Sequence, residues 1–585
     1  MKRSNVVPNC ASLLERVTKM SRIQLAFATG SALCLVLLLN SQPAQACGGL
    51  FCSASAPVNQ AAERIIFSKN ADQTVTAVVQ IQYEGPSEEF AWVLPVPGIP
   101  EVKVSSDLAF TRIQQASNPS YTFTTEVEGR CKQRRSSSDS ATFGSPNAGA
   151  GGSAGSGGAG GGGVEVLASG NVGPYDYVVI RPDTSFENVG DVMVEWLTAE
   201  GYDVVPPGGD PDDIAELLGA YMLDGMNLLA FRLTKGNSTG TIRPIRITYE
   251  SDQPMIPIRP TAVAANDDMG VMVWVLGESR AVPVNYKALE LNQVLIDWLN
   301  GARNYNQVVV AAANEAGGQG FVAERAGPST DYENVVILPF ERDDWEALRM
   351  SVDELSAADV LQESAWRFAA WDGYRGLMER FLPESVDLDA FISCPSCYED
   401  GLADIDILAF IEDLEEDVIE PMLATQELLD SRPYVTRLYT TLSAPEMDLD
   451  PLFDFNPDLP DVSNLHTARR VIECHRSIYQ EEAPTRFELE DGRVVRLHQG
   501  DPWPFSTGDE EPLPANAKVL ALTTSGPGTV VTDNSAAIDE ALSQHNATVA
   551  SPGCGCGVVS PGAHLGTWAS LALFALLRRR RRRPA

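Results

Sequence analysis

The segment Cys394-Pro395-Ser396-Cys397 has the C-x-x-C spacing, which is compatible with three kinds of chemistry. Two thiols at this spacing can form a structural disulfide, act as a redox pair, or supply half of a zinc site. Cys474 and His475 have the side chains to complete a zinc site, and they also carry the atoms of a nucleophile and its base. A structural disulfide, within the segment or to Cys474, is the simplest interpretation, and the others stay open.

An acidic, proline-containing loop is the second place with metal-binding side chains. Its carboxylates include Asp448, Asp450, Asp454 and Asp458. Oxygen-rich loops bind Ca²⁺, but the spacing here matches no standard calcium loop. A solvated acidic loop is therefore the main interpretation. No cofactor is predicted, and calcium or zinc are the alternatives.

Familiar catalytic motifs add no further reactive group. The H-E-x-x-H motif and the Walker A loop are absent from the sequence. Residues 148–163 contain only Gly, Ala and Ser, and they match G-x-S-x-G and G-x-G-x-x-G. Neither match lies between a strand and a helix, which both mechanisms require. The sequence thus assigns no catalytic residue and favours a protein that is not an enzyme.

The charge balance excludes one class of partner. Among 585 residues, 79 Asp and Glu stand against 43 Lys and Arg, and the formal net charge is -36. A body this acidic repels the phosphate backbone, so general binding to nucleic acid is not expected. The composition is otherwise that of a globular protein, with 44% hydrophobic residues.

The N-terminus has the pattern of a secretory signal peptide. An apolar run at 25–39 is followed by Ala44 and Ala46, which fit an A-x-A cleavage site with Cys47 first in the mature chain. The segment is longer than the usual ~15–30 residues, so a start at Met20 is favoured. We predict an exported protein cut by signal peptidase; a retained anchor or a lipoprotein are the alternatives.

The C-terminus has the pattern of a second targeting signal. Residues 558–577 carry no formal charge and, at ~1.5 Å per residue, would just span a ~30 Å hydrocarbon core. Six arginines, Arg578–Arg583, follow and favour a cytoplasmic end. With Cys554 and Cys556 before the helix, this order resembles the MYXO-CTERM sorting signal of myxobacteria. The resemblance implies processing at one of these cysteines by an intramembrane protease, then lipid attachment and surface display.

The remaining cysteines indicate an oxidising compartment. Six lie in the predicted exported body, namely Cys47, Cys52, Cys131, Cys394, Cys397 and Cys474. An even number in an exported protein predicts disulfides, but spacing alone does not fix which cysteines pair.

The predicted fold class is α+β, with a β-rich first half and a more helical second half. Alternating apolar residues predict a strand at 74–83, and Ser105–Asp107 predict the start of a short helix to about 115. We also expect helices at 286–299 and 357–381 and a hairpin at 487–497 with Asp-Gly at its turn.

Composition divides the chain into eight segments. They are a signal peptide (1–46), a β-rich start of the body (47–134), a Gly/Ser/Ala-rich linker or insertion (135–163), a mixed α/β region (164–300), a mainly helical region (301–480), a hairpin region (481–523), a polar spacer (524–553), and the Cys motif with transmembrane helix and Arg tail (554–585). Whether the Gly-rich run separates domains or interrupts one stays open.

Several segments resemble one uncharacterised family. They are Ala46-Cys47-Gly48-Gly49-Leu50-Phe51-Cys52, Glu63-Arg64-Ile65-Ile66-Phe67, Phe90-Ala91-Trp92-Val93-Leu94-Pro95-Val96-Pro97, 314–322 and 434–441. Their order looks like the bacterial secreted family called domain of unknown function 2330, over residues 46–480. The resemblance implies an exported envelope protein and no particular chemistry.

These observations support two functions. The first is a binding or structural protein of the cell envelope, attached by its C-terminal helix or a lipid, with its body outside the cytoplasm and an unknown ligand. The alternative is an envelope enzyme or thiol-disulfide oxidoreductase that uses Cys394 and Cys397 with Cys474 and His475.

Overall fold

The computed structural model describes most of the chain between residues 59 and 549. The described ranges are 59–84, 91–132, 164–183, 185–186, 188–202, 210–233, 243–263, 265–398, 402, 404–505 and 513–549. The residues predicted for signal cleavage, Cys52, the two tail cysteines and the span 558–577 lie outside these ranges. Within the ranges, no helix is both long enough and apolar enough to cross a membrane.

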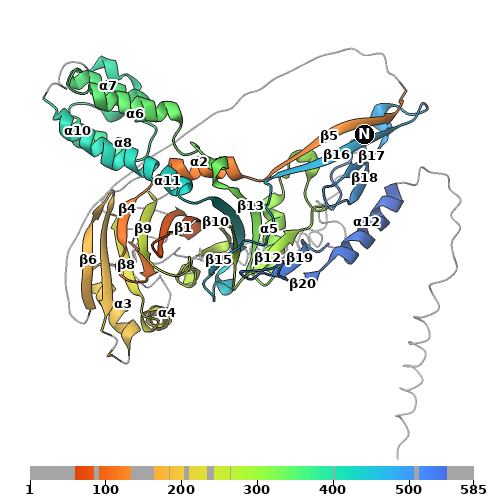
Figure 1. Cartoon of the computed structure of the whole chain (residues 1–585), viewed down its shortest axis with the longest axis horizontal. Helices are drawn as coiled ribbons and strands as arrows, with labels where there is room; N and C mark the ends of the chain where they lie inside the picture. Colours follow the sequence, from red (N-terminus) through yellow and green to blue (C-terminus); the bar gives the residue numbers. More distant parts are fainter. Residues whose placement is uncertain are drawn as a thin grey trace, which may run out of the picture. The chain divides into compact units, whose positions relative to one another are not determined.

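Contacts divide the chain into two compact units (Figure 1). Of the described residues, unit 1 contains those within 59–122, 164–467 and 505–538. Unit 2 contains the described residues within 123–132, 468–504 and 539–549. Each unit is therefore assembled from segments that are far apart in the sequence.

A ten-stranded sheet is the centre of unit 1. Its order is β20 (Thr529–Asp533), β19 (Asn516–Ala521), β12 (Lys287–Leu291), β13 (Gly320–Pro328), β14 (Tyr434–Leu442), β10 (Ala265–Gly277), β1 (Asn59–Lys69), β2 (Thr74–Glu84), β9 (Ile245–Glu250) and β4 (Glu101–Val104). The pairs β1–β10 and β12–β13 are parallel, and the other neighbours are antiparallel.

A smaller sheet and the helices complete unit 1. The smaller sheet has the order β3 (Ala91–Val96), β8 (Asn227–Leu233), β7 (Tyr175–Pro182) and β6 (Val164–Val172), and β11 (Arg280–Pro283) pairs with β15 (Phe453–Asn456). The helices are α2 (Asp107–Ser117), α3 (Val189–Ala199), α4 (Pro211–Leu223), α5 (Tyr305–Glu315), α6 (Pro339–Ser351), α7 (Ala357–Phe368), α8 (Tyr374–Phe381), α9 (Leu388–Ser393), α10 (Ile407–Leu414) and α11 (Glu420–Asp430). Figure 1 shows α6, α7, α8 and α10 grouped together.

The large sheet has a hydrophobic core on each face. Ile65 and Phe67 of β1 belong to the core that includes the smaller sheet and helices α3 and α4. Ile66 between them belongs to the core that includes α2 and the helices α6–α11. Because successive side chains of a strand point to opposite faces, a strand buried on both faces reads as a continuous apolar run. Residues 271–276 of β10 divide between the two cores in the same alternating way.

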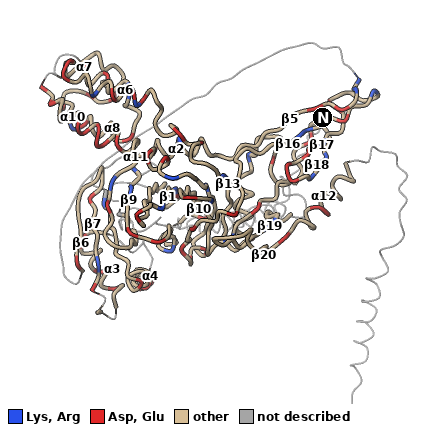
Figure 2. Tube along the Cα trace, viewed as in Figure 1, with Lys and Arg blue, Asp and Glu red and all other residues tan. Residues whose placement is uncertain are grey.

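Unit 2 is built on one four-stranded sheet. Its order is β18 (Val494–His498), β17 (Pro484–Glu488), β16 (Leu465–Cys474) and β5 (Ser120–Gly129), and α12 (Ser535–Val549) ends in this unit. A disulfide joins Cys131 to Cys474. Basic and acidic residues both lie on these strands, as Figure 2 shows, and Arg486 forms ion pairs with Glu128, Glu473 and Glu488. Cross-strand charge pairs and the disulfide thus stabilise a small sheet.

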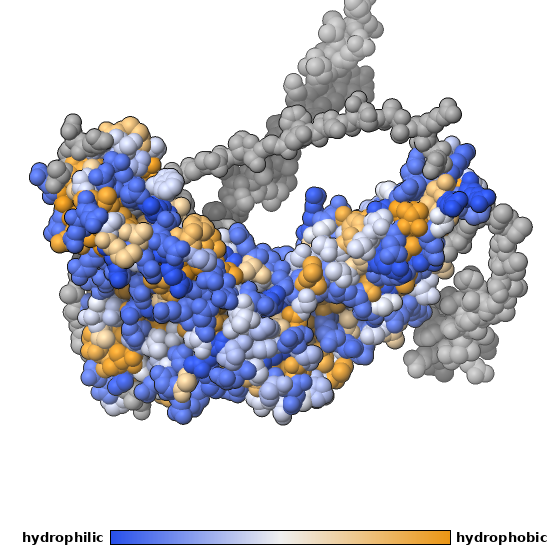
Figure 3. All heavy atoms as spheres, turned by 45° about the horizontal axis from the view of Figure 1, so that its top comes forward, coloured by the Kyte–Doolittle hydropathy of each residue, from blue (hydrophilic) through white to orange (hydrophobic). Residues whose placement is uncertain are grey.

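One face of the molecule is drawn in Figure 3. It is mostly hydrophilic, with apolar residues in separate patches.

Several sequence predictions are confirmed. The chain is mixed α and β with a β-rich first half, and β2 and α2 lie where they were expected. Ser106 begins α2 and accepts a hydrogen bond from the Ala109 amide. The hairpin β17–β18 turns at Asp491-Gly492, where Gly492 has a φ of 85°.

The expectation of a more helical second half is only partly correct. Helices α5–α11 lie within 305–430, but the strands β14–β20 follow them. The predicted helix at 286–299 is instead strand β12 followed by a short 3-10 turn. A buried strand and a helix segment can share this apolar pattern. The pattern at 286–299 therefore did not distinguish them, which explains the error.

Two other boundaries also differ from the prediction. The expected helix at 357–381 is two helices, α7 and α8, separated at Gly373, which has a φ of 86° that glycine adopts readily. The predicted polar spacer 524–553 contains strand β20 and the whole of helix α12. This region looks polar because β20 is exposed along its whole length and only a narrow stripe of α12, including Ile538 and Leu542, is buried.

Candidate functional site

The structure separates the cysteines that the sequence suggested as one site. Cys394 forms a disulfide with Cys397 in unit 1, and Cys474 forms one with Cys131 in unit 2. A disulfide sulfur is neither a nucleophile nor a zinc ligand. The Nδ1 atom of His475 instead lies 2.8 Å from the hydroxyl of Ser477.

The C-x-x-C disulfide lies at the end of a helix. Cys394 is the C-terminal cap of α9, and Cys397 is exposed. Redox-active pairs place the first cysteine at a helix N-terminus, where the helix dipole stabilises a thiolate. At a C-terminus the dipole has the opposite sign, so this environment does not favour an attacking thiolate.

The four aspartates of the acidic loop have separate protein partners. Asp448 accepts a hydrogen bond from Gln319, Asp450 from Tyr221, Asp454 from Gln253, and Asp458 from the Gly526 amide. Across the described ranges, no three His, Cys, Asp or Glu side chains are gathered closely enough to hold a metal ion. The structure therefore does not form the predicted metal site from these residues.

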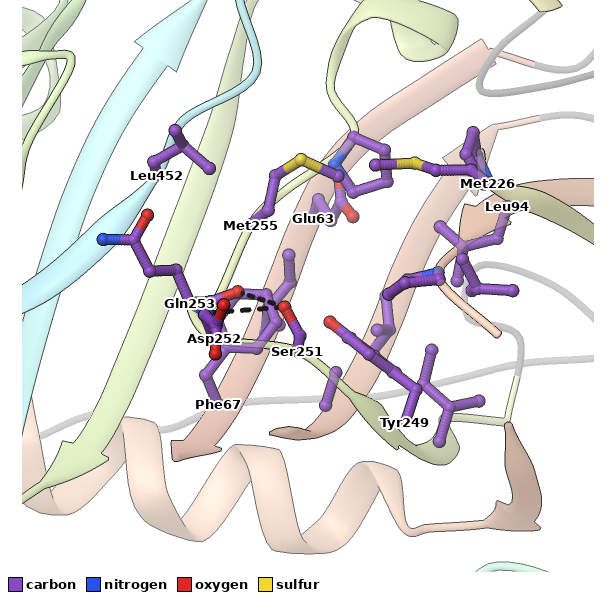
Figure 4. A pocket seen from close by; sticks show the side chains of 18 residues that line it. Glu63, Phe67, Leu94, Met226, Tyr249, Ser251, Asp252, Gln253, Met255 and Leu452 are labelled. Carbon is purple, nitrogen blue, oxygen red and sulfur yellow. Dashed lines mark hydrogen bonds between the residues drawn. The ribbon is translucent and has the colours of Figure 1, made fainter. Parts of the chain in front are cut away.

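A cavity of about 290 Å³ lies between the two sheets of unit 1 (Figure 4). Strands β1, β2 and β9 form one wall, and β3 with the residues after it contributes to another. The lining residues are Glu63, Ile65, Phe67, Ala77, Val79, Leu94, Pro95, Val96, Pro97, Met226, Ile247, Tyr249, Ser251, Asp252, Gln253, Met255, Pro257 and Leu452. Most are apolar, as in sites for small molecules.

Strand alternation decides which side chains reach this cavity. Glu63, Ile65 and Phe67 alternate along β1, and Ala77 pairs with Ile247 across β2 and β9. The residues between them point to the opposite face of the sheet. Glu63 therefore projects from a strand into space that is otherwise mostly apolar, and Figure 4 shows it in the cavity with Met255 and Tyr249.

Among the described residues, no cation pairs with the buried Glu63. Its side-chain hydrogen bond there is a long one of 3.4 Å, which Nε2 of Gln60 donates to Oε2. The residues paired with it on the neighbouring strands are Ile81 and Val271. Burial raises the pKa of Glu63 to about 7, and the hydrogen bond from Gln60 only slightly opposes this. This carboxyl group thus titrates close to neutral pH.

The opposite face of β2 and β9 has a cavity of different character. It is also about 290 Å³, but its wall includes Thr76, Thr248, Arg246, Lys103 and Glu427. Lys103 pairs with Glu101 at 3.1 Å, and both side chains are half-exposed or more. This cavity carries charges of both signs in an open setting, so it defines its ligand less sharply than the apolar one.

A second buried glutamate lies on the same sheet. Glu324 of β13 forms an ion pair with Arg437 of β14 at 2.6 Å and accepts a hydrogen bond of 2.7 Å from the Tyr305 hydroxyl. Arg437 also donates to the hydroxyl of Ser117 at 3.0 Å and lies over the ring of Trp274. Burial raises the pKa of Glu324, and Arg437 and Tyr305 oppose that rise. These partners make it part of the core.

Sequence reasoning did not identify Glu63 as a site residue. The usable signal was its position two residues before Ile65 and four before Phe67, which places it on the same face as apolar core residues. A carboxylate on the apolar face of a strand is rare unless it is paired or functional. The sequence could not show that, among the described residues, the fold places no Lys, Arg or His side chain beside the Glu63 carboxyl group.

Comparison with known proteins gives a family and no activity. The model of a family described as "Uncharacterized protein conserved in bacteria (DUF2330)" matches residues 42–371. This range includes Glu63 and 314–322, whereas 434–441, which the resemblance included, lies outside it. No curated protein and no solved structure matches the chain. Because the match covers more than half of the sequence, the chain belongs to this uncharacterized bacterial family.

Proposed function

We propose that this protein is an exported cell-envelope protein that binds a small, mainly apolar molecule in the cavity of unit 1. The observation that carries the proposal is the cavity between the two sheets, with its apolar walls and the buried carboxyl of Glu63. Its volume of about 290 Å³ is at the lower limit of the ~300–1,000 Å³ found for small-molecule sites.

The walls of the cavity favour an apolar ligand. Val79, Leu94 and Ile247 supply branched aliphatic surface, and Phe67 adds an aromatic ring. Burial of apolar surface is worth roughly 25 cal/mol per Å², so filling such a space is favourable for a ligand of matching shape. The polar groups are few, which is typical of sites that orient a ligand through one or two contacts.

Features of the sequence support export and attachment. The signal-like N-terminus with Ala44 and Ala46, and the order of Cys motif, apolar helix and arginines at the C-terminus, are the basis. The disulfides Cys131–Cys474 and Cys394–Cys397 are typical of proteins outside the cytoplasm. Signal peptidase and an intramembrane sorting protease are the partners proposed for maturation.

A fluorescent dye tests ligand binding. The neutral apolar dye N-phenyl-1-naphthylamine is titrated into the processed full-length protein, and we expect saturable binding at one site. The variant Ala77→Leu adds three side-chain carbon atoms to the cavity wall and should weaken dye binding at least tenfold. The matched control Ala347→Leu makes the same change at an exposed position of α6 and should leave binding unchanged.

Three results would contradict the proposal. The dye could show no saturable binding, Ala77→Leu could bind as the wild type does, or the two alanine variants could lose binding equally. Circular dichroism of each variant shows whether Ala77→Leu folds, and the smaller change Ala77→Val repeats the test if it does not. The intact mass of the protein from its native envelope tests export: a chain beginning before Cys47 and retaining Arg578–Arg583 would argue against both processing steps.

A further inference from the structure

We infer that the ligand of this cavity is a small cationic amphiphile, whose positive group pairs with Glu63 and whose apolar part fills the space between the sheets. The inference deepens the proposed function and rests on it. Three observations carry it: the sign of the charges that face the cavity, the lack of partners for Glu63, and the nature of the side chains around it.

The cavity presents only negative formal charge. Among its 18 lining residues, the charged side chains are Glu63 and Asp252, and none is Lys, Arg or His. Glu63 lies on β1 deep in the wall, whereas Asp252 is exposed in the segment after β9. An anionic ligand would be repelled by both carboxylates, and a cation would be attracted along the route between them.

Among the described residues, Glu63 lacks the partners that a buried carboxylate needs. Its side chain has the single long hydrogen bond from Gln60, while β2 and β10 present Ile81 and Val271 beside it. A buried carboxylate without a cation is costly, and an opposite charge within a few ångströms removes most of that cost. A ligand cation at this position would therefore gain a contact that the protein itself does not provide.

The surrounding side chains suit a cation attached to an apolar body. Phe67 and Tyr249 present aromatic rings to the cavity, and Met226 and Met255 present polarisable sulfur atoms (Figure 4). Aromatic faces attract cations, and methionine adapts to irregular apolar shapes. Burial raises the pKa of Tyr249 far above its usual value, so this hydroxyl stays neutral and does not compete for the cation.

The titratable groups around the cavity define the expected pH dependence. Glu63 of β1, Tyr249 of β9 and Asp252 are those among the lining residues. Tyr249 does not ionise in the accessible range, and the pKa of Glu63 is raised to about 7 by burial. Affinity for a cation should thus increase as the pH rises through 7, because ionised Glu63 becomes available. A neutral ligand that accepts a hydrogen bond from protonated Glu63 should show the opposite trend.

Hexylamine and hexan-1-ol form a matched pair of probes. Hexylamine stays protonated between pH 5.5 and 8.5, since alkyl ammonium groups have a pKa near ~10.4. Each competes with N-phenyl-1-naphthylamine for the processed full-length protein at both pH values. We expect hexylamine to bind at least tenfold more tightly at pH 8.5 than at pH 5.5, and hexan-1-ol to show little change.

Two variants assign the effect to Glu63. Glu63→Gln keeps the shape of the side chain and should remove both the preference for hexylamine over hexan-1-ol and its pH dependence. Asp252→Asn should reduce hexylamine affinity only about two- to threefold, because an exposed charge is screened by solvent. Glu165→Gln, at an exposed glutamate of β6, is the matched control and should change neither.

The outcomes separate this inference from the proposed function. If the dye binds but hexylamine binds no better than hexan-1-ol, or binds equally to Glu63→Gln, the cationic ligand is wrong and the apolar site stands. If hexan-1-ol binds more tightly at pH 5.5 than at pH 8.5, Glu63 acts as a hydrogen-bond donor and the inference is overturned in favour of a neutral ligand. If the dye does not bind, the proposed function fails first.

Discussion

Glu63 and Glu324 are both buried on strands of the same ten-stranded sheet, at 6% and 3% exposure, but their surroundings differ. Glu324 has Arg437 at 2.6 Å and the Tyr305 hydroxyl at 2.7 Å. Glu63 has one hydrogen bond of 3.4 Å from Gln60 and faces a cavity. The carboxylate of Glu324 is neutralised by the fold, whereas that of Glu63 is left for a proton or a ligand to neutralise.

This difference shows that burial of a carboxyl group does not by itself identify a binding residue. Desolvation alone raises the pKa of both groups, so a shifted pKa does not distinguish a core residue from a binding residue. The number of partners does distinguish them, because a fully paired carboxylate has nothing left to offer a ligand. An unpaired carboxyl beside free space is the arrangement that functional sites use.

The largest effect is expected from Arg437→Met. The substitution keeps most of the volume but leaves Glu324 buried without its cation, which typically costs ~3–5 kcal/mol. Urea denaturation at pH 7 measures the free energy of unfolding. The double variant Arg437→Met/Glu324→Gln should recover a large part of the loss, because no charge is then left unpaired. A single variant that loses less than ~1 kcal/mol would mean that Glu324 resembles Glu63 after all.

Glu63→Gln should change the pH dependence of stability. The pKa of Glu63 is about 7 in the folded protein and near 4.5 when it is unfolded, so the folded state binds the proton more tightly. Its contribution to stability is therefore lost as pH rises from about 4.5 to about 7, by at most ~3 kcal/mol. The variant should be less sensitive to pH in that window, and its advantage over the wild type should be largest above pH 7.

Urea denaturation at pH 5 and pH 8 measures this difference. The control is Glu165→Gln, which should follow the wild type at both pH values. If Glu63→Gln and the wild type lose the same stability between the two pH values, Glu63 is ionised in the folded protein at pH 5 and the contrast with Glu324 disappears.

Tyr305→Phe should have a smaller effect near Glu324. It removes one donor to a buried carboxylate, and hydrogen bonds to charged groups contribute ~1.5–3 kcal/mol. The control Tyr177→Phe removes a hydroxyl that has no recorded hydrogen bond in the described part of the chain and should cost much less. An equal loss in both variants would show that the Tyr305 hydroxyl does not support Glu324.

The smallest effect is expected from Gln60→Leu. Its hydrogen bond to Glu63 is long, at 3.4 Å, so its loss should cost under ~1 kcal/mol at pH 5, where Glu63 is protonated. At pH 8 the cost should be larger, because the amide then supports a carboxylate. A cost that is large at pH 5 would mean that Gln60 is a full partner and that Glu63 is better satisfied than its geometry indicates.

The two cavities on either side of β2 and β9 follow from the same alternation. Ala77 and Val79 line the apolar cavity, whereas Thr76 and its β9 partner Thr248 point to the other face and line the polar one. The sequence alternation at 74–83 predicted these two faces. It did not predict that each face would leave a space, because cavities depend on how distant elements pack against the sheet.

Local patterns were enough for part of the fold. Strand β2, helix α2 with its Ser106 cap and the Asp491-Gly492 hairpin are each specified by side chains close together in sequence. Segments 286–299 and 524–553 were misread, since β12 is buried on both faces and α12 buries only a narrow stripe. In both, the decisive contacts come from other parts of the chain.

The sequence alone therefore determined the acidic charge, the alternating faces of its strands and the family. Only the tertiary structure decided that Arg437 reaches Glu324, that Cys131 pairs with Cys474 across 343 residues, and that no cation among the described residues reaches Glu63. The physical reason is that period-2 alternation is encoded by adjacent residues, whereas pairing depends on which distant strands become neighbours.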